Sequence, residues 1–484
     1  MIMKRAMKLA ACAVGALLAA TALCGCRPGT GGVSDSGTLT IWSCFADSTT
    51  GDADAWKIAE DMFHEKYPDI SIRSTDHKLN TDCYNDMAYY YAINKLPDIV
   101  NTEMYTEAMV DMGYLIPLDD YVTEEYKDQF VNGILDGVTF DGKMYALPVR
   151  ASTMALLCNM TLLRKCAEYD HRELGGKYTS DWFEDDNYQS GDFLYPETPD
   201  KLYEMCSEYH SVYEETDYWT VREEQAGNAY YGYDTDGAAI MVNVVENGES
   251  SAFRSLAYMA MFGGNFVDEN GDVLLSTEDN IEGMEFWQKL VREGLTCGYG
   301  ATTEDGVNSY FFAESTATPF MIDIPAIFAN YLTSATITFD YEYYPLPLAE
   351  GVSNTVLCGS VYMGVTRSCA NPEAAAYFLE CLTSAEYQSE MYLHSTNRLP
   401  VVQTVIDEIL TDEGGVYAEK NAEMGKILEA FNSNSNIIFG LPGFTTSYSN
   451  IWARYTSCIN SIYSGGSVAS ALQMFDQDIQ QYLN

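Results

Sequence analysis

The sequence predicts an α/β protein with a parallel β-sheet near its N-terminus, in a chain long enough for two or three domains. Three observations support this prediction: a length of 484 residues, 47% apolar against 20% charged residues, and strand-like segments alternating with helix-like ones over residues 38–101. A composition so rich in apolar side chains can build a large core, which excludes an intrinsically disordered chain.

The alternation begins at residues 38–42, a short run of β-favouring side chains. Apolar residues then recur at helical spacing around Trp56, Ala59 and Phe63, and Pro68 ends this predicted helix. The next segments predict a strand, a helix and a strand, at residues 69–73, 82–94 and 97–101. Because βαβ units place their strands in parallel, this order predicts a parallel sheet.

A β-hairpin is predicted between residues 136 and 149. The Asp141-Gly142 dipeptide, which is typical of tight hairpin turns, separates two β-favouring runs. The same stretch fits the phosphate-loop pattern G-x-x-x-x-G-K, but Met144 stands where that pattern requires Ser or Thr. We therefore expect a hairpin here and not a nucleotide site.

Two later helices carry start signals. Ser276, with Asp279 three residues later, resembles a capping box ahead of a helix that contains Trp287. Asn371 before Pro372 indicates an N-cap followed by a proline at the first helical position. Both helices are expected to bury one apolar face.

The charge balance excludes one large class of partner. The chain has 26 Lys and Arg against 71 Asp and Glu, which gives a net charge of −45. Such a surface repels phosphate backbones, so we expect no nucleic-acid partner.

Motifs for catalysis or metal binding are absent from the sequence. His64-Glu65 begins like a zinc-protease motif, but Pro68 occupies the place of the second histidine. We therefore expect no metal site and no cofactor. A pair of acids that cleaves glycosides is defined in space and not by spacing, so an enzyme of that class stays an open alternative.

The N-terminus predicts export and anchoring. Residues 1–25 have the basic start and apolar run of a signal peptide, and Leu23-Cys24-Gly25-Cys26 resembles a bacterial lipobox with Cys26 as the lipidated residue. Residues 26–37 are rich in Gly, Ser and Pro, as a flexible tether is. We expect a protein held on the outer face of the bacterial cell membrane; the alternative is an ordinary secretory signal with a chance cysteine.

Ten cysteines remain after the N-terminal ones, and they are dispersed without tight pairs. We expect buried free thiols, with a disulfide framework as the alternative. These cysteines are residues 44, 83, 158, 166, 206, 297, 358, 369, 381 and 458.

Eight short stretches together resemble the extracellular solute-binding proteins of carbohydrate ABC transporters, the group that includes maltose-binding protein. They occur in the order found in that family. The resemblance is poor between residues 165 and 260 and after 400. The stretches are residues 39–42, 63–70, 96–100, 113–120, 142–148, 312–317, 344–347 and 371–388.

This resemblance implies a two-lobed periplasmic-binding-protein-like fold (type II), with mainly parallel sheets, helices on both faces and three inter-lobe crossovers. It implies lobe 1 at residues 37–148 plus 352–394, and lobe 2 at residues 149–351 plus 395–484. A monomer would bind a carbohydrate in the cleft, close around it by hinge motion, and deliver it to the permease subunits of an ABC transporter. Such a protein is not an enzyme.

Aromatic residues are candidates for the sugar site, because a flat ring can stack on the apolar face of a sugar. Trp42 ends the first predicted strand, where open α/β sheets bind their ligands. Trp219 precedes a tyrosine cluster that includes Tyr231. The alternative for each is packing in the core or on a lobe surface.

Polar candidates follow from the resemblance, position by position. Each lies after a strand or at one of the three implied crossovers, and for each the alternative is a structural role. They are Glu103, Arg150, Asp323, Gly359, Ser360 and Arg398.

Two other functions stay open at this point. One is a lipid-anchored secreted glycoside hydrolase. The other keeps the fold but changes the ligand, since the acidity of the chain would suit a polyamine or a peptide.

Overall fold

The computed structural model describes most of the chain from Gly37 onward. The described residues are 37–43, 45, 52–76, 81–216, 238–242, 249–268, 272–297, 318–326, 328–329, 339–395, 397–434, 436–439, 448–480 and 482. The predicted signal peptide, Cys26, Trp219 and Tyr231 lie outside these residues. Among the helices of the described ranges, none has the length and apolarity needed to cross a membrane.

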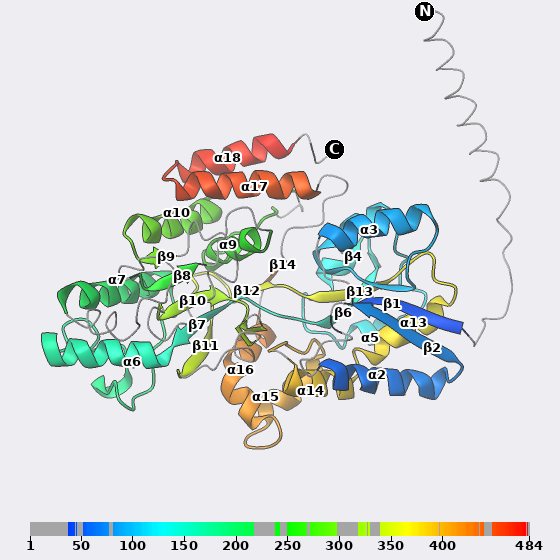
Figure 1. Cartoon of the computed structure of the whole chain (residues 1–484), viewed down its shortest axis with the longest axis horizontal. Helices are drawn as coiled ribbons and strands as arrows, with labels where there is room; N and C mark the ends of the chain where they lie inside the picture. Colours follow the sequence, from blue (N-terminus) through cyan, green and yellow to red (C-terminus); the bar gives the residue numbers. More distant parts are fainter. Residues whose placement is uncertain are drawn as a thin grey trace, which may run out of the picture.

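A first five-stranded sheet lies toward one end of the elongated molecule (Figure 1). Its strand order is β2-β1-β3-β13-β6. These strands are β1 (Gly37–Ser43), β2 (Ile70–Asp76), β3 (Ile99–Asn101), β6 (Ala146–Arg150) and β13 (Val361–Val365). The helices associated with this part of the chain are α2 (Asp52–Lys66), α3 (Thr81–Ala92), α4 (Thr106–Asp111), α5 (Glu124–Lys127), α13 (Pro372–Cys381) and α14 (Ala385–His394).

Helices cover both faces of this sheet because successive strand residues point to opposite sides. Leu39 and Ile41 pack in the same buried cluster as Trp56 of α2. Trp42 belongs to the other cluster, with Met87 of α3. The predicted βαβ order is therefore confirmed, and Trp56 lies in the core.

A second five-stranded sheet lies toward the other end, in the order β11-β7-β10-β8-β9 (Figure 1). Its strands are β7 (Ala155–Asn159), β8 (Ile240–Val242), β9 (Thr296–Cys297), β10 (Phe320–Asp323) and β11 (Tyr341–Pro345). The helices α6 (Met160–Tyr169), α7 (Pro199–Glu215), α9 (Glu249–Met261) and α10 (Glu278–Arg292) belong to this part. This part also includes a π-helical turn at Asp170–Leu174 and a 3₁₀ turn at Glu184–Asp186.

Four of the five strands in each sheet run in one direction, so both sheets are mainly parallel, as the resemblance implied, with one reversed strand in each. In the first, β1 is parallel to β2 and β3, but β13 is antiparallel to β3 and β6. In the second, β7 is antiparallel to β10 and β11, while β8 is parallel to β9 and β10. The antiparallel strands arise because β7 and β13 directly continue segments that cross between the two sheets. The expectation of mainly parallel sheets is therefore confirmed.

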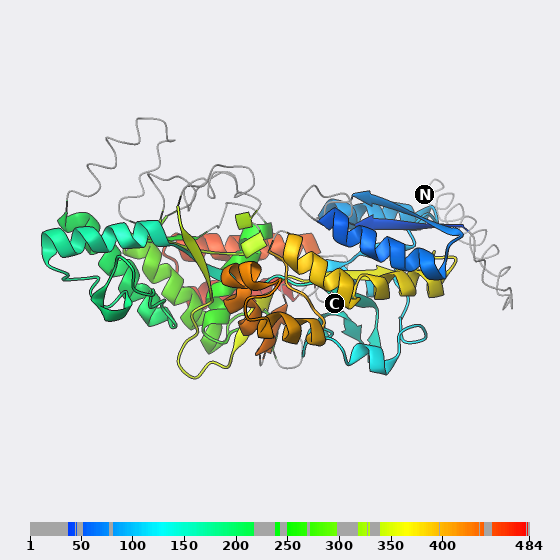
Figure 2. The ribbon, with the colours of Figure 1, turned by 90° about the horizontal axis from the view of Figure 1, so that it is seen from below.

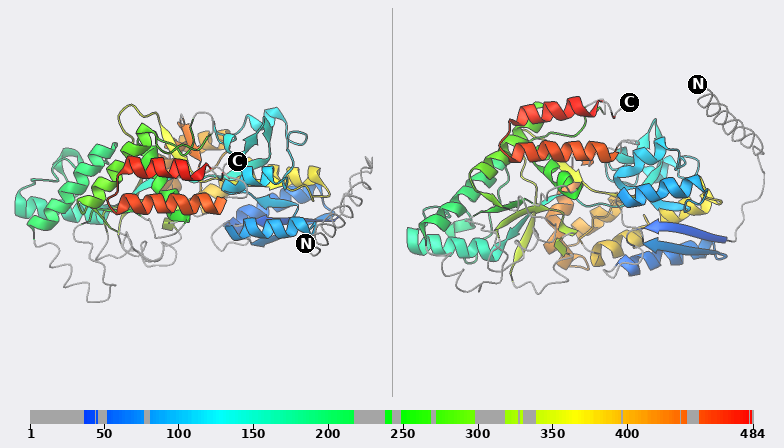
Figure 3. Two further views of the ribbon diagram at one scale, coloured as in Figure 1. Left: turned by 90° about the horizontal axis from the view of Figure 1, so that it is seen from above. Right: turned by 45° about the horizontal axis from the view of Figure 1, so that its top comes forward.

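The C-terminal part supplies the remaining helices. Helices α15 (Gln403–Thr411) and α16 (Ala418–Asn432) lie between the two ends of the molecule, next to α14 (Figure 2). Helices α17 (Tyr448–Tyr463) and α18 (Val468–Ile479) pack side by side against α9 and α10 (Figure 3).

The local signals read from the sequence are confirmed with one exception. Strands β4 (Thr139–Phe140) and β5 (Lys143–Met144) form the predicted hairpin, and the φ angles of 51° at Asp141 and 70° at Gly142 are those of a type I′ turn. Asn371 caps α13 as predicted. The N-cap of α10 is Thr277, not Ser276, and its hydroxyl accepts from the amide of Asn280.

Seven of the described cysteines are free thiols: residues 158, 166, 206, 358, 369, 381 and 458. Burial raises the pKa of each thiol; the pKa of Cys358, for example, rises to about 11. All but the half-buried Cys369 are buried. The expectation of buried thiols is confirmed for residues 158, 166, 206, 358, 381 and 458.

Candidate ligand-binding site

Three segments that cross between the two sheets lie side by side, and we call them the crossing ribbon: residues 149–154, 355–360 and 397–401. Ala151 and Leu399 exchange two backbone hydrogen bonds of 2.9 and 2.8 Å. Ser152 and Gly359 exchange two more, of 3.1 and 2.8 Å. Residues 149–154 therefore form the middle strand, with the other two segments paired to its opposite edges. The second segment contains β12 (Thr355–Cys358), which also pairs in parallel with β14 (Asn436–Phe439).

The ribbon stands at the carboxyl ends of parallel strands from both sheets. In the first sheet, Arg150 ends β6, which runs in the same direction as β1 and β3. In the second sheet, Asp323 ends β10 opposite Ala155, the residue that directly follows the ribbon. Ligands of open α/β sheets bind outside the carboxyl ends of strands, so this arrangement places a candidate site beside the ribbon.

A buried glutamine from α14 fastens two of the crossing segments. The Nε2 atom of Gln388 donates to the carbonyl oxygens of Val149 (2.6 Å) and Leu382 (3.0 Å). Its Oε1 atom accepts from the amide of Val401 at 2.9 Å. Because Gln388 is fully buried, these bonds replace solvent for backbone groups of the first and third segments.

Two predicted site residues, Gly359 and Arg398, contact Ser152, and a third, Ser360, follows Gly359 in the chain. The hydroxyl of Ser152 donates to the carbonyl of Gly359 at 2.7 Å, and the Nη1 atom of Arg398 donates to the same hydroxyl at 3.2 Å. Ser360 follows Gly359, and its hydroxyl lies 3.1 Å from the sulfur of Cys358. The amide of Gly359 is already bonded to Ser152, so a ligand would have to displace that bond to use it.

Arg150 lies on the first-sheet side of the ribbon and is buried. Its Nη1 atom lies 3.0 Å from Oδ2 of Asp52, which starts α2. Its guanidinium also lies over the ring of Phe45, 4.3 Å from the ring centre. This environment fixes Arg150 between a carboxylate and an aromatic face, a position suited to holding the site in shape.

Asp323 lies on the second-sheet side and is also buried in an ion pair. Its Oδ1 atom lies 2.8 Å from Nε of Arg254 on α9 and also accepts from the amide of Ile324 at 2.7 Å. Arg150 and Asp323 therefore occupy matching places at the strand ends of the two sheets, each with a buried partner of opposite charge.

Glu103 lies two residues after the end of β3 and has an unusual backbone conformation. Its φ angle is 37°, which side chains other than glycine rarely adopt, and the side chain is only half-buried. The hydroxyl of Thr106 donates to the Glu103 carbonyl at 2.8 Å and holds this turn. Strain of this kind gathers at functional sites, which favours the predicted ligand role of Glu103.

Trp42 is largely buried, with 9% of its surface exposed. Its ring meets that of Tyr90 on α3 edge to face, with the ring centres 5.0 Å apart. Its surroundings are those of a core residue, one position before the end of β1, and its contact with a ligand stays a prediction.

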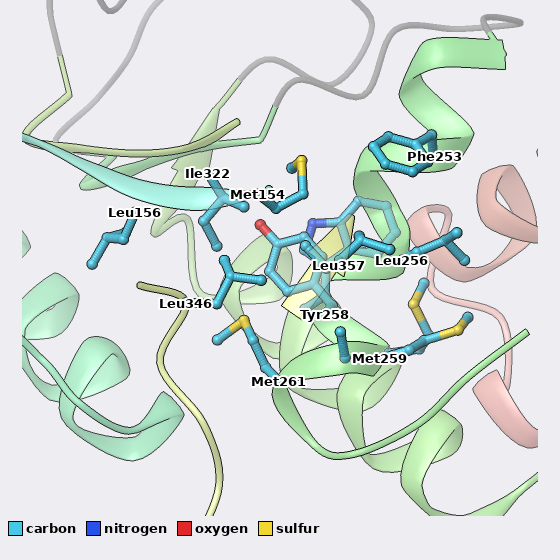
Figure 4. Packing of buried hydrophobic residues seen from close by; sticks show 14 of the residues in the cluster. Met154, Leu156, Phe253, Leu256, Tyr258, Met259, Met261, Ile322, Leu346 and Leu357 are labelled. Carbon is cyan, nitrogen blue, oxygen red and sulfur yellow. The ribbon is translucent and has the colours of Figure 1, made fainter. Parts of the chain in front are cut away.

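Two residues that the sequence reasoning missed complete the base of the site. Ser152 is one. The other is Phe253, whose ring lies 3.7 Å from the position that a Cβ atom of Gly359 would occupy. Phe253 lies near the start of α9 and belongs to the same buried cluster as Met154, Leu357, Leu256 and Tyr258 (Figure 4). No sequence motif marks either residue, because both act through neighbours distant in the chain.

An open pocket of about 710 Å³ lies where the loop after β11 passes the starts of α7 and α10, and it reaches Thr355 at the start of the second crossing segment. Its charged lining residues are Asp200, Asp279, Glu282 and Glu350. It contains none of the predicted site residues. Within the described ranges, no three His, Cys, Asp or Glu side chains gather as metal ligands would.

A sequence model of the bacterial extracellular solute-binding proteins matches residues 90–422, which is more than half of the chain. The chain belongs to this family. The family expected from the eight stretches is thereby confirmed. A binding protein of Brucella abortus (strain 2308) is 24% identical to this solute-binding protein over 203 residues, 42% of this chain and 36% of the relative. The match thus spans about a third of the length of the curated relatives.

Solved structures similar to this solute-binding protein confirm the two-lobed type II fold. The cyclic α-maltosyl-1,6-maltose binding protein of Arthrobacter globiformis superposes with a TM-score of 0.68 at 18% identity, over 93% of this chain and 99% of that one. The sugar-binding protein MalE of Xanthomonas citri gives 0.66 at 15%, over 92% and 97%. UgpB of Mycobacterium tuberculosis, solved with glycerophosphocholine, gives 0.66 at 15%, over 93% and 98%.

Proposed function

We propose that this solute-binding protein captures a sugar or oligosaccharide between two lobes and delivers it to the permease of an ABC transporter. The observation that carries the proposal is the crossing ribbon, which joins two sheets at the carboxyl ends of their parallel strands. A ligand beside the ribbon contacts groups from both sheets at once. This is the geometry that a receptor closing around its ligand requires.

The lobes are those implied by the resemblance, residues 37–148 plus 352–394 and 149–351 plus 395–484. The composition of the two sheets supports this division, since β1, β2, β3, β6 and β13 fall largely in the first set and β7 to β11 in the second. Helix α14 packs on α2, and helix α16 packs on β11, which also agrees with the boundary near residue 395.

Hinge closure is the proposed mechanism. A ligand that contacts both lobes binds the closed form more tightly than the open form, and binding therefore shifts the population toward closure. The closed form is what the permease subunits would recognise. The chain itself performs no chemistry on the ligand in this mechanism.

A sugar is the proposed ligand because the half-buried Glu103 and Arg398 offer a carboxylate and a guanidinium, both of which bond to hydroxyl groups. Several proteins of similar fold are described as maltose or maltodextrin binders. UgpB shows that the fold also accommodates glycerophosphocholine. A polyamine or peptide ligand, or glycoside cleavage, would be the alternative outcome for this chain.

The proposed location is the outer face of the cell membrane, with the chain held as a monomer by a lipid on Cys26. The lipobox-like Leu23-Cys24-Gly25-Cys26 and the Gly- and Ser-rich residues 26–37 support this anchor. Membership of a family of extracellular proteins agrees with export.

Calorimetric titration of the chain from Arg27 onward tests the proposal. The ligands are a panel of plant and host oligosaccharides, with polyamines and short peptides as controls. We expect a dissociation constant in the micromolar range or below for at least one sugar, and intact sugar recovered afterwards. Cleaved sugar would favour the hydrolase, and a signal from a cationic control alone would replace the ligand class.

A further inference from the structure

We infer that Ser152 is a positioning residue whose hydroxyl links all three crossing segments and sets the balance between the open and closed forms. This inference rests on the hinge closure of the proposed function. It goes beyond that function in assigning the control of closure to one side chain, which is not among the candidate ligand contacts.

The hydroxyl of Ser152 joins segments that are far apart in the sequence. It donates to Gly359, 207 residues away, at 2.7 Å, and accepts from Arg398, 246 residues away, at 3.2 Å. Ser152 itself is 2% exposed, so water does not readily replace either bond. A side chain of the first segment thus connects the second segment with the third.

The backbone pairs the first segment with the third through Ala151 and Leu399, and with the second through Ser152 and Gly359. The hydroxyl of Ser152 adds a side-chain connection to these pairs. Ser152 and Gly359 already share two backbone hydrogen bonds, which an alanine at position 152 would keep. The contact of Ser152 with Arg398, by contrast, is made by the hydroxyl. The positive charge of the guanidinium strengthens this hydrogen bond. Because the same hydroxyl also bonds to Gly359, a movement of Arg398 affects the second segment.

Arg398 forms one end of the connection made by the Ser152 hydroxyl. It is half-buried, whereas Ser152 and Leu399 are buried. At the other end, Gly359 lies beside Phe253, which starts the buried face of α9 in the second lobe. We place the bending of the ribbon during closure between these two ends, so that rotation of one lobe against the other stretches at least one of the two bonds of Ser152. The hydroxyl therefore favours one hinge angle over the others.

The experiment measures the distance between the lobes in the full lipidated chain in detergent. Fluorophores are attached to azide-bearing amino acids at positions 57 and 201, on exposed faces of α2 and α7 at the two ends of the molecule, which avoids labelling the native thiols. The chains compared are wild type, Ser152→Ala, Arg398→Met and the double variant, each without and with sugar.

We expect Ser152→Ala to shift the ligand-free distance distribution, and Arg398→Met to shift it in the same direction. The double variant should shift it no further than the larger single change, because the two residues act through one connection. Sugar affinity should change on the order of three- to tenfold in Ser152→Ala, the size of one hydrogen bond.

Two further variants separate positioning from general stability. Ser207→Ala removes a hydroxyl that bonds to a backbone carbonyl on α7, far from the ribbon, and should leave the distances unchanged. Ser152→Cys keeps the shape with a weak hydrogen-bonding group and should shift the distances in the direction of Ser152→Ala, which decides the matter if the alanine variant fails to fold.

An unchanged distance distribution in Ser152→Ala and Ser152→Cys, or additive shifts in the double variant, would overturn the inference. This outcome does not depend on whether the proposed sugar ligand is confirmed. If no sugar binds to wild type, the ligand-free distances still decide the role of Ser152.

Discussion

The Nε atom of Arg254 lies 2.8 Å from Oδ1 of Asp323, with both side chains at 3% exposure or less. This ion pair joins the end of β10 to α9 at the edge of the proposed cleft. Taking two charges out of water is costly, and their mutual attraction offsets this cost only while both partners are present.

Asp323→Ala should therefore lower the free energy of unfolding by about 3–5 kcal/mol, because it leaves the guanidinium of Arg254 buried without this carboxylate. Urea denaturation followed by circular dichroism measures the loss. Asp61→Ala is the matched control, since Asp61 pairs with Lys57 at 67% exposure of both side chains. That variant should cost less than about 0.5 kcal/mol. Equal losses in the two variants would show that burial of the Arg254 pair has no consequence.

Glu103→Gly should separate stability from binding. Glycine adopts the φ angle of 37° without strain, so the unfolding free energy should rise by about 0.5–1 kcal/mol. Sugar affinity should fall about tenfold or more, because a charge-assisted hydrogen bond is lost. Denaturation and calorimetry measure the two effects. Asn94→Gly, at a φ of 55° away from the ribbon, should leave affinity unchanged. Wild-type affinity in Glu103→Gly would remove Glu103 from the site.

Gln388→Met should destabilise the fold by about 2–4 kcal/mol. The variant deprives the carbonyl of Val149 and the amide of Val401 of their buried partner, and each unsatisfied group carries a desolvation penalty. Chemical denaturation measures the change. Gln473→Met, on an exposed part of α18, is the control and should change stability by no more than about 0.5 kcal/mol. A change that small in Gln388→Met would mean that the two crossing segments do not depend on this side chain.

Glu208 on α7 should make the protein less stable as the pH rises. Burial raises the pKa of Glu208 to about 7, with further upward contributions from Asp181 and Glu204, although the indole of Trp182 donates to it. Below about pH 4 the carboxyl is protonated in both states and contributes nothing. Between that pH and about 7 the unfolded chain loses the proton first, so stability falls across this window and stays lower above it.

Glu208→Gln should remove this part of the pH dependence, because the amide is neutral at every pH and its oxygen can still accept from Trp182. The free energy of unfolding of the variant minus that of wild type should be about 1–2 kcal/mol larger at pH 8 than at pH 4. This range allows for solvent screening of a half-buried group. Thermal unfolding at the two pH values measures this gain. Glu285→Gln, exposed on α10, controls for the loss of one carboxylate. A parallel pH profile in Glu208→Gln and wild type would refute the assignment.

The fold could be predicted because its signals are local. The Asp141-Gly142 turn and the Asn371 cap each depend on a few neighbouring residues, and both are confirmed. The cap of α10 was misplaced by one residue because Ser276 and Thr277 offer the same chemistry, and only the backbone decides between them. The one reversed strand in each sheet depends on where the chain crosses, which no local pattern records.

The site was less predictable because its contacts are not local. The resemblance assigned Gly359, Ser360 and Arg398 to the implied crossovers. In the structure, Gly359 and Arg398 both form hydrogen bonds with Ser152. Ser152 itself has no distinguishing sequence context, since its partners lie more than 200 residues away. Likewise, nothing in the order of residues shows that Arg150 pairs with Asp52.

The most direct test of sugar capture by hinge closure is the distance between positions 57 and 201, measured by fluorescence energy transfer while a binding sugar is added. We predict that the distance distribution shifts to a closed population, with a midpoint that matches the calorimetric dissociation constant. A sugar that binds with no change in the distance would contradict capture by closure, and the same shift on adding a polyamine in place of any sugar would contradict the proposed ligand.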